Sequence, residues 1–437
     1  MKQIYLFFAL ICICRSYSSA QSLNPDPIRV EFENAKKLRD YFYGFSLYDL
    51  DSNRFIMGIN EDKHFAPASN TKVFTLFTVL KTLGDSIPGI HYVEKGDSLI
   101  FWGTGDPTFL HNRLDTKKVF DFLKGTPKKL YFIEPAPTQE PFYRNGWSIE
   151  DYNEYYQPEI STFPIYGNVV TFRASADRLL ATPAEFQQNL SLVSDTTAKF
   201  SIMRNFENNL FTYNHTYIPR NYVNEKPFRY SNELMVKLLS DSLHREVTII
   251  GQPASIKDVK TIYSARTVDI LRQMMLPSDN FLAEQFQMLA AREKFGSFQT
   301  QRLRTYFQDE YFDLFSDKIQ LYDGSGLSTY NKVTPRSMIE VLLLINEMVS
   351  NRNELEYLFP VGGVSGTLKT AYKLDQGQPF VWAKTGTING VHNQSGFIRT
   401  RTGRNLVFSF MNTNYLGSST PVRREIVKIV TFIRENY

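Results

Sequence analysis

Hydrophobic and polar positions alternate most regularly near the two ends of the chain. Residues 43–47 and 54–59 alternate on either side of Asp51-Ser52-Asn53, a pattern that predicts a β-hairpin. The stretch 420–435 is amphipathic at helical spacing and predicts a closing helix. Strand-like alternation near the C-terminus occurs at residues 380–384, 395–400 and 406–411. We expect the hairpin and these strands to form one antiparallel sheet.

Other stretches carry apolar residues at the spacing of a helix. Pro67 precedes the clearest of them, which runs from about Ser69 to Leu83 and is stopped by Gly84. Further stretches of this kind are residues 28–39, 266–276, 280–294 and 335–350. Between them, from about 91 to 245, short strand-like runs such as Ser98–Trp102 alternate with turns.

These patterns predict an α/β (α+β) protein, in which an antiparallel sheet is flanked by helices and interrupted by a large β-rich insertion. We expect residues 21–90 and 246–437 to form the main domain. Residues 91–245 would form one or more inserted domains.

The first twenty residues have the composition of a signal peptide. Lys2 is followed by the apolar run Tyr5–Cys14, and Ser18-Ser19-Ala20 offers small residues at a cleavage site. The run is too short for a stable transmembrane anchor. We therefore expect residues 1–20 to be removed and the protein to be periplasmic or associated with the cell envelope. Both cysteines lie in this leader, so the mature chain would have no disulfide.

Composition narrows the function further. The 437 residues are 42% hydrophobic and 22% charged with a net charge of +4, and no block of Lys and Arg is present, which excludes a nucleic-acid partner. The histidines lack metal-ligand spacing, and no nucleotide-binding or zinc-protease motif occurs. We expect no metal and no organic cofactor.

Three short strings carry the candidate chemistry. Ser69-Asn70-Thr71-Lys72 begins a predicted helix, Ser278-Asp279-Asn280 precedes another, and Lys384-Thr385-Gly386-Thr387 ends a predicted strand. Each string alone is explained as a helix cap or an exposed strand end. Their occurrence in this order, each on the expected element, predicts a serine acyl-transfer site.

The chemistry of Ser69 and Lys72 supports that interpretation. A serine and a lysine three residues apart on a helix share one face. Serine is a weak nucleophile without a base. Lys72 can act as that base if its pKa falls from about 10.4 towards about 7. Burial and a nearby cation lower a lysine pKa, and Lys384 is the candidate cation.

Further strings give the chain a family resemblance. It resembles the D-alanyl-D-alanine carboxypeptidase/endopeptidase family, the low-molecular-mass class C penicillin-binding proteins, from about residue 25 to the C-terminus. The strings that carry the resemblance are residues 382–387, 390–391, 395–397, 323–328, 105–108 and 366–368, besides the three motifs. The resemblance implies a β-lactamase/transpeptidase-like fold, with the insertion between the first and second motifs.

The resemblance also implies a role for each matched residue. Ser69 would be acylated, and Lys72 would be its general base. Ser278 would pass a proton to the leaving amine, while Asn280 would hold the backbone amide of the substrate.

The resemblance also implies that the last motif, which lies on a predicted strand, binds the substrate. Lys384 and Thr385 would bind the terminal carboxylate, and Gly386 lies between them and Thr387. The backbone N–H groups of Ser69 and Thr387 would form the oxyanion hole, in which each donor contributes about 3 kcal/mol.

A segment of the insertion resembles a family element that recognises a free amino group on the diamino acid of the substrate. It runs from Gly146 to Tyr156, with Asp151 as the receptor and Tyr156 as a neighbouring aromatic residue. The alternative is that Asp151 is one of several solvated acids, beside Glu150 and Glu154.

The implied reactions are release of terminal D-alanine from peptidoglycan stem peptides and cleavage of cross-links, with β-lactam antibiotics as inhibitors. One alternative is a β-lactamase or esterase of the same fold, which would turn penicillin over rapidly instead of keeping it bound. Another is a catalytically silent wall-binding module. The intact motifs argue against a silent module.

Overall fold

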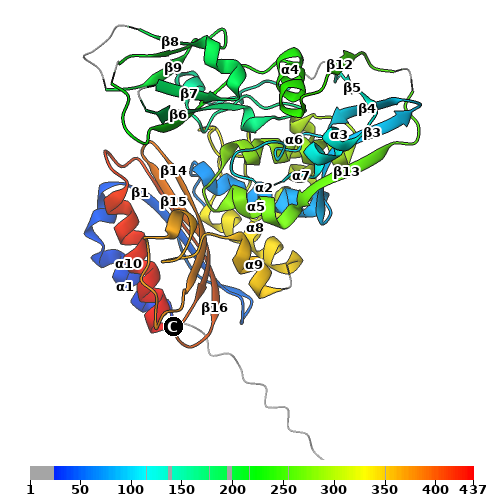
Figure 1. The fold of residues 1–437 in the computed structure, drawn as a ribbon. Coiled ribbons are helices and arrows are strands. Elements are labelled where there is room, and N and C mark those ends of the chain that lie inside the picture. Colours follow the sequence, from blue (N-terminus) through cyan, green and yellow to red (C-terminus); the bar gives the residue numbers. More distant parts are fainter. Residues whose placement is uncertain are drawn as a thin grey trace, which may run out of the picture.

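The computed structural model describes residues 24–437 except 115, 136–139, 177, 194–198, 216, 254 and 350. The predicted signal peptide, residues 1–20, lies outside the described residues. The chain has a lower part, built on one sheet with helices on both faces, and an upper part that contains several smaller sheets (Figure 1).

The main sheet combines strands from both ends of the chain. All its neighbouring strands are antiparallel. In spatial order they are β14 (Val381–Ile388), β15 (Val391–Arg399), β16 (Asn405–Thr413), β1 (Phe42–Asp49) and β2 (Arg54–Ile59). This order confirms that the N-terminal hairpin joins the C-terminal strands.

Helices cover the two faces of this sheet. Successive residues of a strand point to opposite faces, so Phe408 packs with α1 (Asp26–Asn34) and α10 (Thr420–Asn436), while Val407 packs with the larger helical layer. That layer consists of α2 (Thr71–Thr82), α5 (Thr267–Met275), α6 (Asn280–Phe295), α7 (Thr300–Glu310), α8 (Pro335–Met348) and α9 (Arg352–Leu358).

The predicted helix at 28–39 is two elements. Helix α1 ends at Asn34, and a 3₁₀ turn follows at Lys36–Asp40. Phe32 and Leu38 would lie about 120° apart around a continuous α-helix. The break lets both side chains enter the same core, where they are 4% and 1% exposed.

The upper part has its own hydrophobic core and lies between α2 and α5 in the sequence. Its largest sheet contains β12 (Val247–Ile250), β5 (Lys129–Ile133), β4 (Ser98–Gly103), β3 (Ser86–Lys95) and β13 (Lys260–Arg266). Its smaller sheets contain β11 (Val223–Pro227), β6 (Val169–Ser175) and β7 (Arg178–Thr182), and β8 (Leu190–Leu192), β10 (Phe211–Tyr213) and β9 (Ile202–Arg204). Its helices are α3 (Lys118–Gly125) and α4 (Asn232–Leu243).

The upper part is joined to the lower part through a pair of adjacent strands. Strand β3 carries the chain out and β13 brings it back, and the two are antiparallel neighbours. The division at residues 91 and 245 stays a prediction. Strand β3 spans the first boundary, and β12 and β13, which follow the second boundary, belong to the sheet of the upper part.

Candidate active site

Ser69 lies in a 3₁₀ turn, η2 (Ala68–Asn70), immediately before helix α2. The predicted α-helix therefore begins two residues later than expected, at Thr71. The expected contact is nevertheless present, because Lys72 Nζ lies 3.1 Å from Ser69 Oγ and donates to it.

Lys72 is completely buried, and its amine donates to two further oxygens. These are Asn280 Oδ1 at 2.6 Å and the carbonyl oxygen of Ser325 at 2.7 Å. Burial lowers the pKa of Lys72 to about 8, although the carboxylates of Asp323, Asp279 and Glu284 oppose the shift. An appreciable fraction of this amine is therefore neutral near neutral pH and able to accept a proton.

The second motif is held by a strained residue and a helix cap. Ser278 has φ +65°, a left-handed conformation that is uncommon for serine. Asp279 caps α6 by accepting a hydrogen bond from the Leu282 N–H at 2.9 Å, and it pairs with Arg113 of the upper part at 2.8 Å. Strained backbone of this kind is concentrated at functional sites.

Lys384 connects the second and third motifs. Its Nζ donates to Ser278 Oγ at 2.8 Å and to the carbonyl oxygen of Thr385 at 2.6 Å. Burial, and then the charge of Lys72, lower the pKa of Lys384 well below its usual value. A substrate carboxylate beside it would raise that pKa again.

Strand β14 approaches the Ser69 turn so closely that only glycine fits at residue 386. A Cβ atom on Gly386 would lie 2.5 Å from the Pro67 carbonyl oxygen and 2.9 Å from the Asn70 nitrogen. Beyond it, the Thr387 hydroxyl contacts His392 Nδ1 at 2.7 Å. Burial lowers the pKa of His392 to about 4, so this ring is neutral at neutral pH.

The three motifs meet at one cleft of about 970 Å³. Of the predicted residues, its lining includes Ser69, Ser278, Asn280, Thr385, Thr387, Asp151 and Tyr156. The buried side chains of Lys72 and Lys384 contact the lining residues Ser69, Asn280 and Ser278. The structure thus brings together every predicted residue, with Gly386 at the strand contact.

The upper part supplies one wall of this cleft. Asp151 lies in the 3₁₀ turn η3 (Ile149–Asn153), and Asn280 Nδ2 donates to the Tyr156 carbonyl at 3.1 Å. Burial, followed by the Asp151 charge and a hydrogen bond with it, raises the pKa of Tyr156 to about 12. The pair therefore presents a carboxylate beside an aromatic ring.

Several site residues were not assigned a role from the sequence. The Ser325 carbonyl on Lys72 is a backbone group, which leaves no sequence pattern. Thr367 accepts a hydrogen bond from Thr385 Oγ1 at 2.7 Å. Ser325 and Thr367 lie in strings that carry the family resemblance, residues 323–328 and 366–368. That resemblance was the sign in the sequence that these residues belong to the site. The cleft is also lined by the aromatic residues Trp147, Tyr155 and Tyr330.

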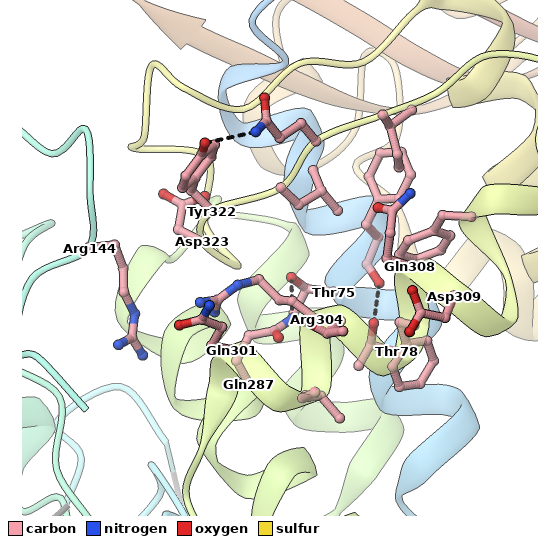
Figure 2. Close-up of a pocket in the computed structure, with 18 of the residues that line it drawn as sticks. Thr75, Thr78, Arg144, Gln287, Gln301, Arg304, Gln308, Asp309, Tyr322 and Asp323 are labelled. Atoms are coloured by element: carbon pink, nitrogen blue, oxygen red, sulfur yellow. Dashed lines mark hydrogen bonds between the residues drawn. The ribbon is translucent and has the colours of Figure 1, made fainter. Parts of the chain in front are cut away.

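A second cavity, of about 510 Å³, lies against helix α2 (Figure 2). Thr75, Arg144, Gln287, Arg304 and Asp323 are among its lining residues. None of the described residues that line it belongs to the three motifs. It is therefore separate from the Ser69 cleft.

Within the described residues, no group of three or more His, Cys, Asp or Glu side chains could hold a metal ion. No helix in that part of the chain is long and apolar enough to cross a membrane.

Comparison with known families matches residues 30–436 to the D-Ala-D-Ala carboxypeptidase 3 (S13) family. The match covers nearly the whole chain, so this protein belongs to that family of serine-type D-Ala-D-Ala carboxypeptidases.

Individual relatives agree with this assignment. Penicillin-sensitive carboxypeptidase A of Dictyostelium discoideum is 26% identical over 402 residues, 78% of this chain and 76% of that protein. D-alanyl-D-alanine carboxypeptidase DacB of Haemophilus influenzae is 32% identical over 179 residues, 39% of this chain and 36% of that protein. The chain thus matches about a third of the length of the latter relative.

The fold is shown by solved structures. Penicillin binding protein 4 of Haemophilus influenzae superposes with a TM-score of 0.74 at 19% identity, covering 92% of this chain and 99% of that one. The same protein has been solved in complex with a β-lactam. The expected fold class is confirmed.

Proposed function

We propose that this protein is a serine D-alanyl-D-alanine carboxypeptidase that also acts as a D,D-endopeptidase on peptidoglycan. The observation that carries the proposal is the contact between Lys72 Nζ and Ser69 Oγ at 3.1 Å, in a site where burial lowers the lysine pKa to about 8. The family assignment supports the same reaction. The predicted signal peptide would place the enzyme in the cell envelope.

Acylation would begin with neutral Lys72. Its amine takes the proton of Ser69 Oγ as that oxygen attacks the carbonyl carbon before the terminal D-alanine. The negative charge that develops on the carbonyl oxygen would be stabilised by the backbone N–H groups of Ser69 and Thr387. Asn280, which bonds Lys72, would also hold the substrate amide.

Departure of the leaving group needs a proton on its nitrogen. Ser278 Oγ accepts a hydrogen bond from Lys384 at 2.8 Å and is the proposed relay. The terminal carboxylate would lie against Thr385 and Lys384, which would restore the positive charge on Lys384. Water would then hydrolyse the acyl-enzyme and release the shortened peptide.

The test is covalent labelling by benzylpenicillin, which stays attached after its ring opens. Wild-type protein should gain the full mass of the drug on a peptide that contains Ser69, and it should release D-alanine from a pentapeptide. Ser69→Ala should do neither. Ser148→Ala, which changes another serine lining the cleft, should do both. Equal labelling of Ser69→Ala would refute the nucleophile assignment.

The same experiment separates the alternatives. Rapid recovery of free enzyme with hydrolysed penicillin would favour a β-lactamase, and absence of any adduct would favour a silent binding module.

A further inference from the structure

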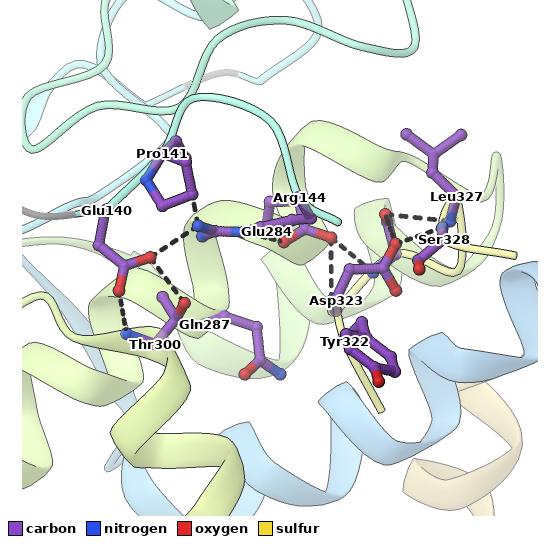
Figure 3. Close-up of polar contacts among 12 residues, drawn as sticks. Glu140, Pro141, Arg144, Glu284, Gln287, Thr300, Tyr322, Asp323, Leu327 and Ser328 are labelled. Carbon is purple, nitrogen blue, oxygen red and sulfur yellow. Dashed lines mark hydrogen bonds and ion pairs between the residues drawn. The ribbon is translucent and has the colours of Figure 1, made fainter. Parts of the chain in front are cut away.

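A buried arginine of the upper part reaches the helical layer behind the active site. Arg144 is 5% exposed, and its Nη1 donates to Glu140 Oε2 at 2.6 Å (Figure 3). Its Nε forms an ion pair with Glu284 Oε2 of helix α6 at 3.4 Å. The guanidinium therefore lies between two carboxylates, one from each part of the chain.

Glu284 in turn holds a backbone loop. The carboxylate is 1% exposed, and its Oε1 accepts hydrogen bonds from the N–H groups of Gly324 at 2.9 Å and Ser325 at 2.8 Å. The carbonyl oxygen of Ser325 accepts a hydrogen bond from Lys72 Nζ at 2.7 Å. A continuous set of contacts thus leads from Arg144 through Glu284 and Ser325 to Lys72.

The charges along this path depend on one another. Burial and the neighbouring Asp323 raise the pKa of Glu284, whereas Arg144, then a hydrogen bond with Ser325 and then Arg304 oppose this rise. The ionised Glu284, together with Asp323 and Asp279, opposes the depression of the Lys72 pKa, while burial causes it. Lys384 was expected to lower the Lys72 pKa, but only burial does so; the charge of Lys72 instead adds to the lowering of the Lys384 pKa by burial.

The same segment continues into the wall of the cleft. Trp147 Nε1 donates to Asp323 Oδ2 at 2.8 Å, and the chain then enters the turn that contains Asp151. Glu140 accepts hydrogen bonds from the N–H and the hydroxyl of Thr300, at the start of α7. Arg144 is thus one of several contacts that fix this wall to the catalytic helices.

We propose that Arg144 is a positioning residue of the reaction. It holds the Glu284 carboxylate against the Gly324 and Ser325 amides and thereby fixes the Ser325 carbonyl on the amine of Lys72. The inference rests on the proposed function, because Lys72 matters here as the base that activates Ser69. A purely structural role is the alternative, although a buried ion pair commonly contributes little net stability.

The test is the pH dependence of acylation by a fluorescent penicillin. Arg144→Met removes the guanidinium but keeps an unbranched side chain, whereas alanine would enlarge the 510 Å³ cavity that Arg144 lines. Without the guanidinium, Glu284 takes up a proton more readily, so the Lys72 pKa falls further. The midpoint of the rate profile should move to lower pH, and the plateau rate should fall about 10- to 100-fold as the carbonyl is displaced. Arg144→Lys should largely restore the midpoint.

Two further variants separate positioning from stability. Glu284→Gln removes the negative charge that Glu284 would lose by protonation in Arg144→Met, so it should shift the midpoint in the same way. It therefore tests the positioning role even if Arg144→Met does not fold. Glu140→Gln removes the other partner of Arg144 and should lower the melting temperature while leaving the midpoint in place.

The outcomes are distinct. A reduced plateau with an unmoved midpoint in both Arg144→Met and Glu284→Gln would reject the positioning role while leaving the proposed function intact. A wild-type protein that penicillin does not acylate would reject the proposed function, and the inference with it.

Discussion

The glycine of the third motif lies directly against the nucleophile turn: a Cβ atom on Gly386 would stand 3.0 Å from the backbone nitrogen of Ser69. This approach sets the spacing between strand β14 and the turn that carries Ser69. It also brings the two proposed oxyanion donors, at Ser69 and Thr387, to the same cleft. Any side chain at residue 386 must push the strand and the turn apart.

Gly386→Ala should therefore reduce acylation by benzylpenicillin about 100-fold, because oxyanion stabilisation requires its donors in place. The change should leave the fold largely intact, and the measurement is the second-order rate constant with circular dichroism as a check. Gly84→Ala is the matched control, since no atom lies within 4 Å of the added carbon. Unchanged acylation in Gly386→Ala would show that the close approach is unimportant.

The pKa of Lys72 predicts the direction of the pH profile. The neutral amine is the active form, so the acylation rate should rise with pH and reach half its maximum near a pH of about 8. Lys72→Arg should lower the rate by several orders of magnitude at every pH, because arginine does not lose its proton in this range. Lys81→Arg, on the exposed side of the same helix, should behave as wild type. A rate that falls as pH rises through 8 would exclude neutral Lys72 as the base.

The position of Asp151 in the cleft predicts which peptides are chosen. Asp151→Ala should lower kcat/KM for peptides with a free side-chain amine by about 1.5–3 kcal/mol, because a charge-assisted hydrogen bond is lost. Peptides with that amine acetylated should be poor substrates of both proteins, and penicillin acylation should barely change. The measurement is D-alanine release from the two peptides. Glu150→Ala, an exposed neighbour in the same turn, is the control. An equal loss on both peptides would remove Asp151 from the recognition site.

Asp106 predicts a pH-dependent change in stability. It is 4% exposed, and burial raises its pKa to about 6, although Thr108 donates two hydrogen bonds to it. A raised carboxyl pKa stabilises the fold only while the proton is bound, and that stability is lost as pH rises through about 6.

Asp106→Asn should therefore raise the free energy of unfolding by about 1–3 kcal/mol at pH 7.5 and have little effect at pH 4. Urea unfolding at the two pH values measures this difference. The reverse pattern, with destabilisation only at pH 7.5, would mean that the ionised carboxylate is needed for its hydrogen bonds.

The sequence predicted elements whose pattern is local. The main sheet was predicted from alternation, which occurs at residues 43–47 and 54–59 and in the strands that end the chain. The motifs also predicted that Ser278 precedes a helix and that Lys384 lies in a strand, whereas Ser69 lies in a 3₁₀ turn just before its helix. The family resemblance supplied the insertion between them.

Other features depend on contacts between distant residues, which a single sequence does not record. The Ser325 carbonyl and the Tyr156 carbonyl are backbone acceptors, so no residue type marks them. Glu284 and Arg144 are ordinary charged residues until the fold buries them together. The 3₁₀ turn at Ser69 lies directly against β14, and the break after Asn34 lets Phe32 and Leu38 share one core.

The pairing of β3 with β13 has an evolutionary consequence. The chain leaves the lower part and returns to it at neighbouring points, and a segment whose two ends adjoin can lengthen, shorten or be exchanged without altering what flanks it. One wall of the cleft belongs to that segment, whereas Ser69 and Lys384 do not. Under the proposed function, changes in this segment would alter peptide preference and leave the acylation chemistry of Ser69 in place.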